Sequence, residues 1–167
     1  MKHSLLILGA GQYSWVAKET AEAMGCFEKI AFLDDTSKAA MDKLDSYDRF
    51  TASFSHAFVA MGNPALRLQY IQKLQQCGFT PAVLVHPQAT VMPSAVLSPG
   101  SIVEARCVVN SNTAVGTGCI LSAGAVVNHN STLGEGCHVD CNATVPAGSI
   151  LPPHTKVPCG TVFAIKE

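Results

Sequence analysis

The chain has 167 residues, of which 48% are hydrophobic and 14% charged, and its formal net charge at pH 7 is −1. A pI near 6.6 and scattered Lys and Arg residues argue against a nucleic-acid-binding protein, which would carry a basic patch. The apolar run Leu5–Leu8 is far shorter than the roughly 18 residues of a membrane span, and Gly9 and Gly11 end it too early for a signal peptide. We therefore expect a cytoplasmic protein without membrane insertion.

The first 85 or so residues alternate short apolar segments with helical ones, which is typical of a parallel α/β sheet. Gly25 and Gly78 are placed to end two helices, and Asn63-Pro64 is placed to begin the second. No pattern assigns residues 36–56. The predicted strands are Leu5–Leu8, Ile30–Leu33, Ala57–Met61 and Ala82–Val85, and the predicted helices are Tyr13–Met24 and Pro64 to about Cys77.

Three of the predicted strands end on residues suited to a ligand: Gly9-Ala10-Gly11, Asp34-Asp35 and Gly62-Asn63. Ligands of parallel sheets collect at this edge, so the three turns are expected to line one crevice. The glycine turn and the following helix N-terminus would accept a phosphate, and the acids would accept hydrogen bonds from a ribose or a nucleobase. A dinucleotide site and a tight turn without a ligand stay open as alternatives, because Gly9-x-Gly11-x-x-Ser14 lacks the third glycine.

From Val91 to Val162 the chain repeats every six residues. An aliphatic residue begins each of twelve hexads, and a small residue follows four positions later. Such hexads are typical of a parallel β-helix, in which three hexads complete one coil of a triangular prism, so we predict four coils. The aliphatic side chains are expected inside the prism and the small ones at its corners. We predict two domains, residues 1–86 and residues 87–167.

The seven cysteines do not indicate a metal site or disulfides. Cys107, Cys119 and Cys137 occupy small-residue slots of the repeat, no Cys-x-x-Cys occurs, and the other four lack zinc-ligand spacing. We expect structural thiols in a reducing compartment and no metal.

The two halves together resemble the hexapeptide-repeat acetyltransferases that act on nucleotide-linked amino sugars or sialic acids. The resemblance covers nearly the whole chain and is strongest at 124–130 (Gly-Ala-Val-Val-Asn-His-Asn) and 134–139 (Gly-Glu-Gly-Cys-His-Val). It implies a Rossmann-like N-terminal domain, a left-handed β-helix, acetyl-CoA as co-substrate, a UDP-linked amino sugar as acceptor and a homotrimer with active sites between prisms. Residues 1–86 would then bind the nucleotide sugar, and residues 87–167 would transfer the acetyl group to an amine or hydroxyl.

The resemblance also assigns roles to residues. The catalytic base falls on His129 and a contact with acetyl-CoA on His138. Neutral imidazole suits proton removal at pH 7, and the third position of the hexad directs His129 out of the prism. Substrate contacts are expected from Gly9, Gly11, Gln12, Tyr13, Asp34, Asp35, Gly62 and Asn63.

The chain departs from the family pattern in three places. Tyr13 replaces the substrate-facing histidine. Asn130 replaces the acid after the catalytic histidine; it can orient the imidazole but adds no charge, so Glu135 or Asp140 is an alternative carboxylate. The coils after His138 are fewer, which implies a shortened acetyl-CoA groove.

Two other functions stay open. The first is a non-catalytic nucleotide-sugar-binding or assembly module. The second is a hexapeptide-repeat metal enzyme with His129, His138 and His154 as ligands, although the nine-residue spacing of the first two places them on different sides of one prism.

Overall fold

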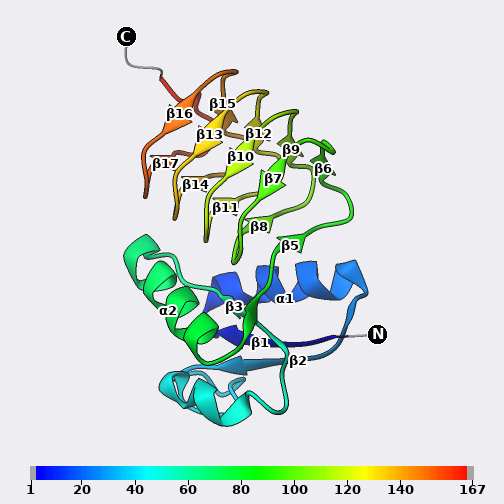
Figure 1. The fold of residues 1–167 in the computed structure, drawn as a ribbon, viewed down its shortest axis with the longest axis vertical. Coiled ribbons are helices and arrows are strands. Elements are labelled where there is room, and N and C mark those ends of the chain that lie inside the picture. Colours follow the sequence, from blue (N-terminus) through cyan, green and yellow to red (C-terminus); the bar gives the residue numbers. More distant parts are fainter. Residues whose placement is uncertain (1–2, 165–167) are drawn as a thin grey trace.

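A computed structural model describes residues 3–164 of the chain and shows two stacked parts (Figure 1). The N-terminal part is a four-stranded parallel sheet in the order β2-β1-β3-β4. Its strands are β1 (His3–Leu8), β2 (Phe27–Leu33), β3 (His56–Val59) and β4 (Thr80–Pro81), with helices α1 (Gln12–Met24) and α2 (Pro64–Gln76). No helix within residues 3–164 is long and apolar enough to cross a membrane.

The helix boundaries follow the predicted capping residues. Gly25 adopts the left-handed conformation (φ 67°) after α1, and the Asn63 side chain accepts a hydrogen bond from Leu66 N at 3.0 Å at the start of α2. The segment without a sequence assignment contains a 3₁₀ helix, η1 (Leu44–Phe50).

Alternating residues of β1 face two different cores. Leu5 and Ile7 pack with α1 and the β-helix, whereas Leu6 and Leu8 pack with residues of α2. Because neighbouring side chains of a strand point to opposite faces, the uninterrupted apolar run of β1 marks a strand that is buried on both sides.

The C-terminal part is a left-handed parallel β-helix whose two-residue strands form three sheets. We call β5-β8-β11-β14-β17 the covered face, because the α/β part packs on it; we call β7-β10-β13-β16 the open face and β6-β9-β12-β15 the third face. The strands are β5 (Leu84–Val85), β6 (Thr90–Val91), β7 (Val96–Leu97), β8 (Ile102–Val103), β9 (Val108–Val109), β10 (Ala114–Val115), β11 (Ile120–Leu121), β12 (Val126–Val127), β13 (Thr132–Leu133), β14 (His138–Val139), β15 (Thr144–Val145), β16 (Ile150–Leu151) and β17 (Lys156–Val157).

The aliphatic slots of the repeat fill the prism as predicted. Val103, Val127 and Val145 are fully buried, and the small residues Cys119 and Ala143 are buried beside them. A further slot, not predicted from the sequence, recurs every six residues and has a backbone in the left-handed region. It holds Gly100, Arg106, Asn112, Gly118, Gly124, Asn130, Gly136, Asn142, Gly148, His154 and Gly160.

The strand predicted at residues 82–85 is wrong as a strand of the α/β sheet. Thr80–Pro81 completes that sheet, whereas Leu84 pairs with Ile102 in the covered face. The physical reason is the six-residue spacing of the repeat. Val85 lies six residues before Val91, the first aliphatic slot, so its side chain continues the interior row of the prism.

Candidate functional site

The three turns predicted to line one crevice do lie together. The backbone N of Ala10 donates to Asp34 Oδ2 at 2.9 Å, and Gly9 N donates to Leu33 O at 2.8 Å. Gly9 has φ 95°, and a Cβ added to it would lie 3.1 Å from Ala60 O, so the turn needs glycine there. The parallel order β2-β1-β3 therefore brings the strand ends to one edge.

The two acids of the crevice have different environments. Both Asp34 oxygens accept backbone hydrogen bonds, from Ala10, Thr36 and Ser37, and these lower its pKa to about 2. Asp35 is exposed, and within residues 3–164 its side chain accepts one hydrogen bond, from Leu44 N at 3.2 Å. Asp35 therefore keeps acceptor capacity for a ligand, whereas Asp34 mainly shapes the turn.

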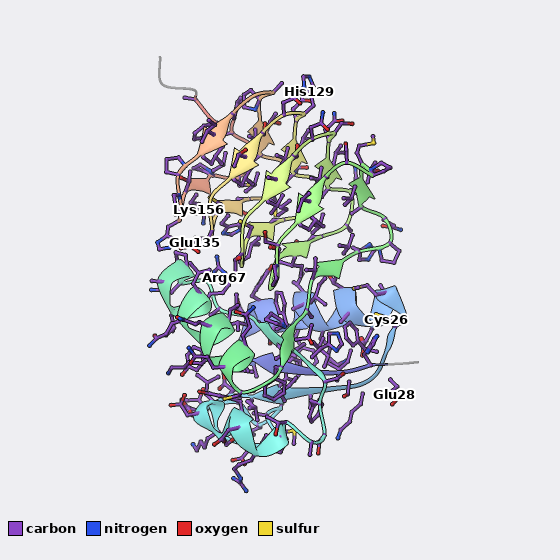
Figure 2. The ribbon with its side chains drawn as sticks, in the orientation of Figure 1. Cys26, Glu28, Arg67, His129, Glu135 and Lys156 are labelled. Carbon is purple, nitrogen blue, oxygen red and sulfur yellow. The ribbon has the colours of Figure 1, made fainter. Side chains whose placement is uncertain are left out.

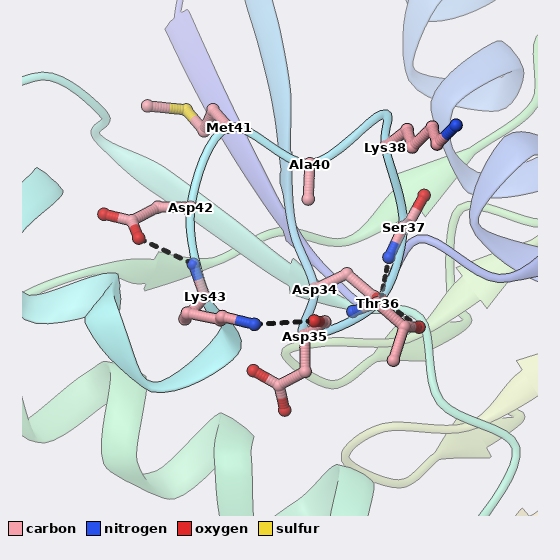
Figure 3. A pocket seen from close by; sticks show the side chains of 9 residues that line it. All are labelled: Asp34, Asp35, Thr36, Ser37, Lys38, Ala40, Met41, Asp42 and Lys43. Carbon is pink, nitrogen blue, oxygen red and sulfur yellow. Dashed lines mark hydrogen bonds between the residues drawn. The ribbon is translucent and has the colours of Figure 1, made fainter.

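A cavity of about 250 Å³ opens beside these acids (Figure 3). Its lining includes two lysines, and Lys43 Nζ donates to Asp35 O at 2.8 Å. The two lysines and the exposed carboxylate of Asp35 therefore line the same small cavity. The lining residues are Asp34, Asp35, Thr36, Ser37, Lys38, Ala40, Met41, Asp42 and Lys43.

The N-terminus of α1 is open to an anion. Gly11 precedes the helix without a side-chain cap, the first turn has no acidic residue, and Gly11 and Gln12 are exposed. A Cβ added to Gly11 or Gly62 would meet no atom within 4 Å. A phosphate could approach this backbone closely. The Asn63 side chain, in contrast, is engaged in capping α2.

The covered face of the β-helix carries a second group of polar side chains, around His138. His138 is half-buried, and its Nε2 lies 3.0 Å from Ser122 Oγ and 3.9 Å from Asp140 Oδ1. Lys156 Nζ lies 3.3 Å from Asp140 Oδ2. Burial lowers the pKa of His138, so its imidazole is neutral at pH 7.

Tyr13 connects the glycine turn to the β-helix. Its hydroxyl donates to Glu104 Oε1 at 3.0 Å, and Ala123 N donates to Glu104 Oε2 at 3.0 Å. Burial raises the pKa of both Tyr13 and Glu104. The hydroxyl of the predicted substrate-facing residue is therefore bonded to a buried carboxylate.

Arg67 joins the two parts of the molecule at their junction (Figure 2). This side chain is 1% exposed. Its guanidinium donates to Met61 O and Gly62 O in the crevice loop and to Gly118 O and Gly136 O in the β-helix, at 2.6 to 3.2 Å. The crevice loop is thus held against the coil that carries His138.

His129 lies elsewhere, on the β-helix far from the α/β part (Figure 2). It is exposed, at the corner between β12 of the third face and β13 of the open face, opposite the covered face. The Asn130 side-chain nitrogen, Nδ2, lies 3.0 Å from His129 Nδ1, and Asn112 Nδ2 donates to Asn130 Oδ1 at 3.3 Å. One chain therefore does not bring His129 to the crevice.

The alternative carboxylates for His129 have other positions. Asp140 contacts His138 and Lys156 on the covered face. Glu135 and His154 line a groove of about 610 Å³ along α2. Among residues 3–164 no group of three His, Cys, Asp or Glu side chains could hold a metal ion, and His129, His138 and His154 do not meet in one chain.

Glu104 and Ser122 were not identified from the sequence. A signal was present, because Glu104, Ser122 and Asp140 are spaced by 18 residues, the length of one coil, and therefore stack in one column. The six-residue repeat does not distinguish the three sides of the prism, whereas a spacing of 18 residues identifies side chains on the same side of successive coils.

Comparison with known proteins agrees with the two-part architecture. Residues 4–74 match the family model of the PglD N-terminal domain. The acetyltransferase domain of PglB from Neisseria gonorrhoeae is 28% identical, with a TM-score of 0.82 over 98% of this chain and 92% of that one. The same domain in complex with acetyl coenzyme A matches with a TM-score of 0.76 over 97% of this chain and 88% of that one, also at 28% identity.

A second enzyme is similar over the same length. A histidine-to-alanine mutant of GDP-perosamine N-acetyl transferase from Caulobacter crescentus, in complex with CoA and GDP-perosamine, is 26% identical. Its TM-score is 0.84 over 96% of this chain and 88% of that one. These matches support a hexapeptide-repeat sugar acetyltransferase, and with it an acyltransferase activity.

Proposed function

We propose that the protein transfers the acetyl group of acetyl-CoA to an amine or hydroxyl of a nucleotide-linked amino sugar. Residues 1–86 would bind the nucleotide sugar, and residues 87–167 would carry out the transfer. The observation that carries this proposal is the crevice, where the glycine turn, the open N-terminus of α1 and the exposed carboxylate of Asp35 meet. Arg67 ties the neighbouring Gly62 to the coil that carries His138.

We propose a uridine nucleotide, as the resemblance implies. Two similar structures contain GDP-perosamine, so a guanosine nucleotide is the alternative to compare. Asp35 would accept hydrogen bonds from the ribose or base, and the Gly11 turn would hold the diphosphate. His138 would contact acetyl-CoA, the co-substrate named with one similar structure. The proposed reaction needs no metal.

We propose His129 as the general base. In the transfer, the acceptor nitrogen or oxygen attacks the thioester carbonyl, a new bond to the acyl carbon forms, and His129 takes the acceptor's proton. The C–S bond then breaks, CoA leaves as a thiolate, and the proton on His129 can convert it to the free thiol. Backbone N–H groups would stabilise the oxyanion.

Asn130 would set the tautomer of His129. With its amide oxygen toward Nδ1–H, the lone pair of Nε2 is free to take a proton; with the amide nitrogen toward Nδ1, it is not. The structure places the amide nitrogen beside Nδ1, so the base requires the Asn130 amide to turn by about 180°. The Asn112 side chain can hydrogen-bond to Asn130 in either orientation, because turning the Asn112 amide exchanges its donor for its acceptor.

A homotrimer would complete the site. His129 lies on the corner opposite the covered face, so the crevice it serves would belong to a neighbouring subunit. The open face offers the contact surface, since Val96 and Ile150 on it are 62% and 76% exposed.

The proposal is tested with acetyl-CoA and a panel of UDP-, GDP- and CMP-linked amino sugars, using mass spectrometry to detect acetylated product. Wild type should acetylate one acceptor, and His129→Ala should lose at least about a hundredfold in kcat. His154→Ala, an exposed histidine of the same β-helix, is the matched control and should remain active. Nucleotide-sugar binding without product from any acceptor would instead indicate a non-catalytic module.

A further inference from the structure

The chain has one tryptophan, Trp15, and it lies in the first turn of α1, which begins at the crevice. Large aromatic side chains usually gain stability from burial, yet this indole is 46% exposed. Trp15 has no role in the transfer described above.

The indole lies where the two turns of the crevice meet. Trp15 follows Gly11 by about one helical turn, and helical side chains lean toward the N-terminus, so the indole is directed toward the glycine turn. Its ring packs against Phe32 of β2, with the ring centroids 5.4 Å apart, and Asp34 follows directly after that strand. The hydrogen bond from Ala10 N to Asp34 Oδ2 joins the same two elements. The ring therefore bridges the start of α1 and the end of β2.

Neighbouring side chains hold the indole without covering it. The Phe32 ring is tilted by 60° to it, and Lys18 Nζ, which also pairs with Glu22, lies 5.7 Å from its centroid. Ala40, which lines the cavity beside Asp35, packs in the same cluster as Phe32. A supported, half-exposed aromatic ring next to a cavity is a surface on which a planar heterocycle can stack.

We propose that Trp15 is a stacking platform for the base of the nucleotide sugar. The inference rests on the proposed nucleotide-binding role of residues 1–86 and adds the contact that holds the base. With the diphosphate at the Gly11 turn and the ribose at Asp35, the base stacks on the exposed part of the indole. Every nucleobase has a π face, so this contact strengthens the binding of uridine and guanosine nucleotides alike. The polar groups of the cavity are left to choose between the two bases.

The fluorescence of the single tryptophan reports this contact directly. UDP, and GDP in a parallel titration, should quench the emission of wild type after correction for absorption by the nucleotide. Inorganic pyrophosphate, which has no base, should not quench it.

Two substitutions separate stacking from simple apolar contact. Trp15→Leu keeps an apolar side chain but removes the π face, so calorimetry should show UDP binding about tenfold more weakly. Trp15→Phe keeps a smaller π face and should bind UDP within about threefold of wild type. Because the indole is half-exposed, both variants should fold.

The matched control is Val16→Ala, which truncates the neighbouring exposed apolar residue of α1 on the side of the cavity against the β-helix. This variant should change neither the affinity for UDP nor the quenching. The inference alone fails if Trp15→Leu binds UDP as tightly as wild type, or if emission stays constant at a UDP concentration that saturates wild type by calorimetry. No UDP or GDP binding to wild type would overturn the proposed function together with this contact.

Discussion

Asn130 meets two requirements at one position. Its backbone occupies the left-handed slot of the repeat (φ 58°), where Gly, Asn and Asp are favoured, and its side chain contacts His129. The resemblance predicted the contact with His129, whereas the backbone requirement could not be predicted from it. Aspartate meets both requirements, so the acid can be restored without strain.

We predict that Asn130→Asp raises kcat by about three- to tenfold, because a carboxylate accepts from Nδ1–H in any orientation and stabilises imidazolium by charge. Asn130→Gly keeps the backbone conformation but loses the contact, and its kcat should fall about tenfold. Steady-state rates at pH 7 provide the comparison. An aspartate variant no faster than wild type would show that Asn130 does not limit the base.

Asp34 should make the stability of the α/β part depend on acid. Its pKa in the folded protein is about 2, below the ordinary value of 3.8, so its contribution is fully present above about pH 4 and is lost as the pH falls toward 2. At pH 6 the free energy of unfolding of wild type should exceed that of Asp34→Asn by about 1 to 2 kcal/mol, a figure reduced because solvent screens the partly exposed carboxylate. At pH 2.5 the difference should be much smaller. Urea unfolding at both pH values measures this difference; an equal difference at both would refute it.

Tyr13 illustrates what the sequence could not supply at the residue scale. The resemblance placed it facing substrate, but its partner Glu104 lies 91 residues away. Only the packing of α1 on the covered face brings the two together. Sequence spacing within the glycine turn contains no information about that contact.

At the scale of elements, local chemistry predicted most of the fold. Gly25, Asn63 and Pro64 set the helix ends, and the hexads predicted the β-helix. The strand at 82–85 was assigned to the wrong sheet because its apolar pattern suits either neighbour, and only the six-residue phase of Val85 distinguishes them.

The β1–α1 turn allows the roles of its glycines to be separated. Gly11→Ala should leave the melting temperature nearly unchanged, because the added Cβ meets no atom within 4 Å, but it should weaken nucleotide-sugar binding at least tenfold by obstructing the phosphate. Gly9→Ala should lower the melting temperature, since φ 95° and Ala60 O oppose a side chain. Calorimetry measures stability and binding; unimpaired binding by Gly11→Ala would place the phosphate elsewhere.

At the scale of the molecule, Arg67 holds the two parts together. Arg67→Met leaves buried carbonyl groups of both parts without donors, so we predict a loss of about 3 kcal/mol or more in the free energy of unfolding. Lys73→Met on the same helix should change stability by less than about 0.5 kcal/mol. Urea denaturation compares them, and similar losses in both variants would contradict this role.

The open face should control assembly. Ile150→Asp places a charge on the exposed apolar row and should convert the proposed trimer to monomers, with loss of the proposed acetyl transfer. Val162→Asp changes an apolar residue of similar exposure that is bridged to β15 of the third face, and should remain trimeric. Analytical ultracentrifugation decides between these outcomes, and a trimeric Ile150→Asp would remove the open face from the interface.

The most direct test of the proposed shared acetyl-transfer site is complementation between two impaired variants, assayed at an acceptor concentration too low for Gly11→Ala to bind. His129→Ala lacks the base but keeps the crevice, whereas Gly11→Ala keeps the base but binds the nucleotide sugar weakly. If each site combines His129 of one subunit with the crevice of its neighbour, trimers assembled from an equal mixture should recover about a quarter of the wild-type rate. Activity that stays at the level of the separate variants would contradict a site built between subunits.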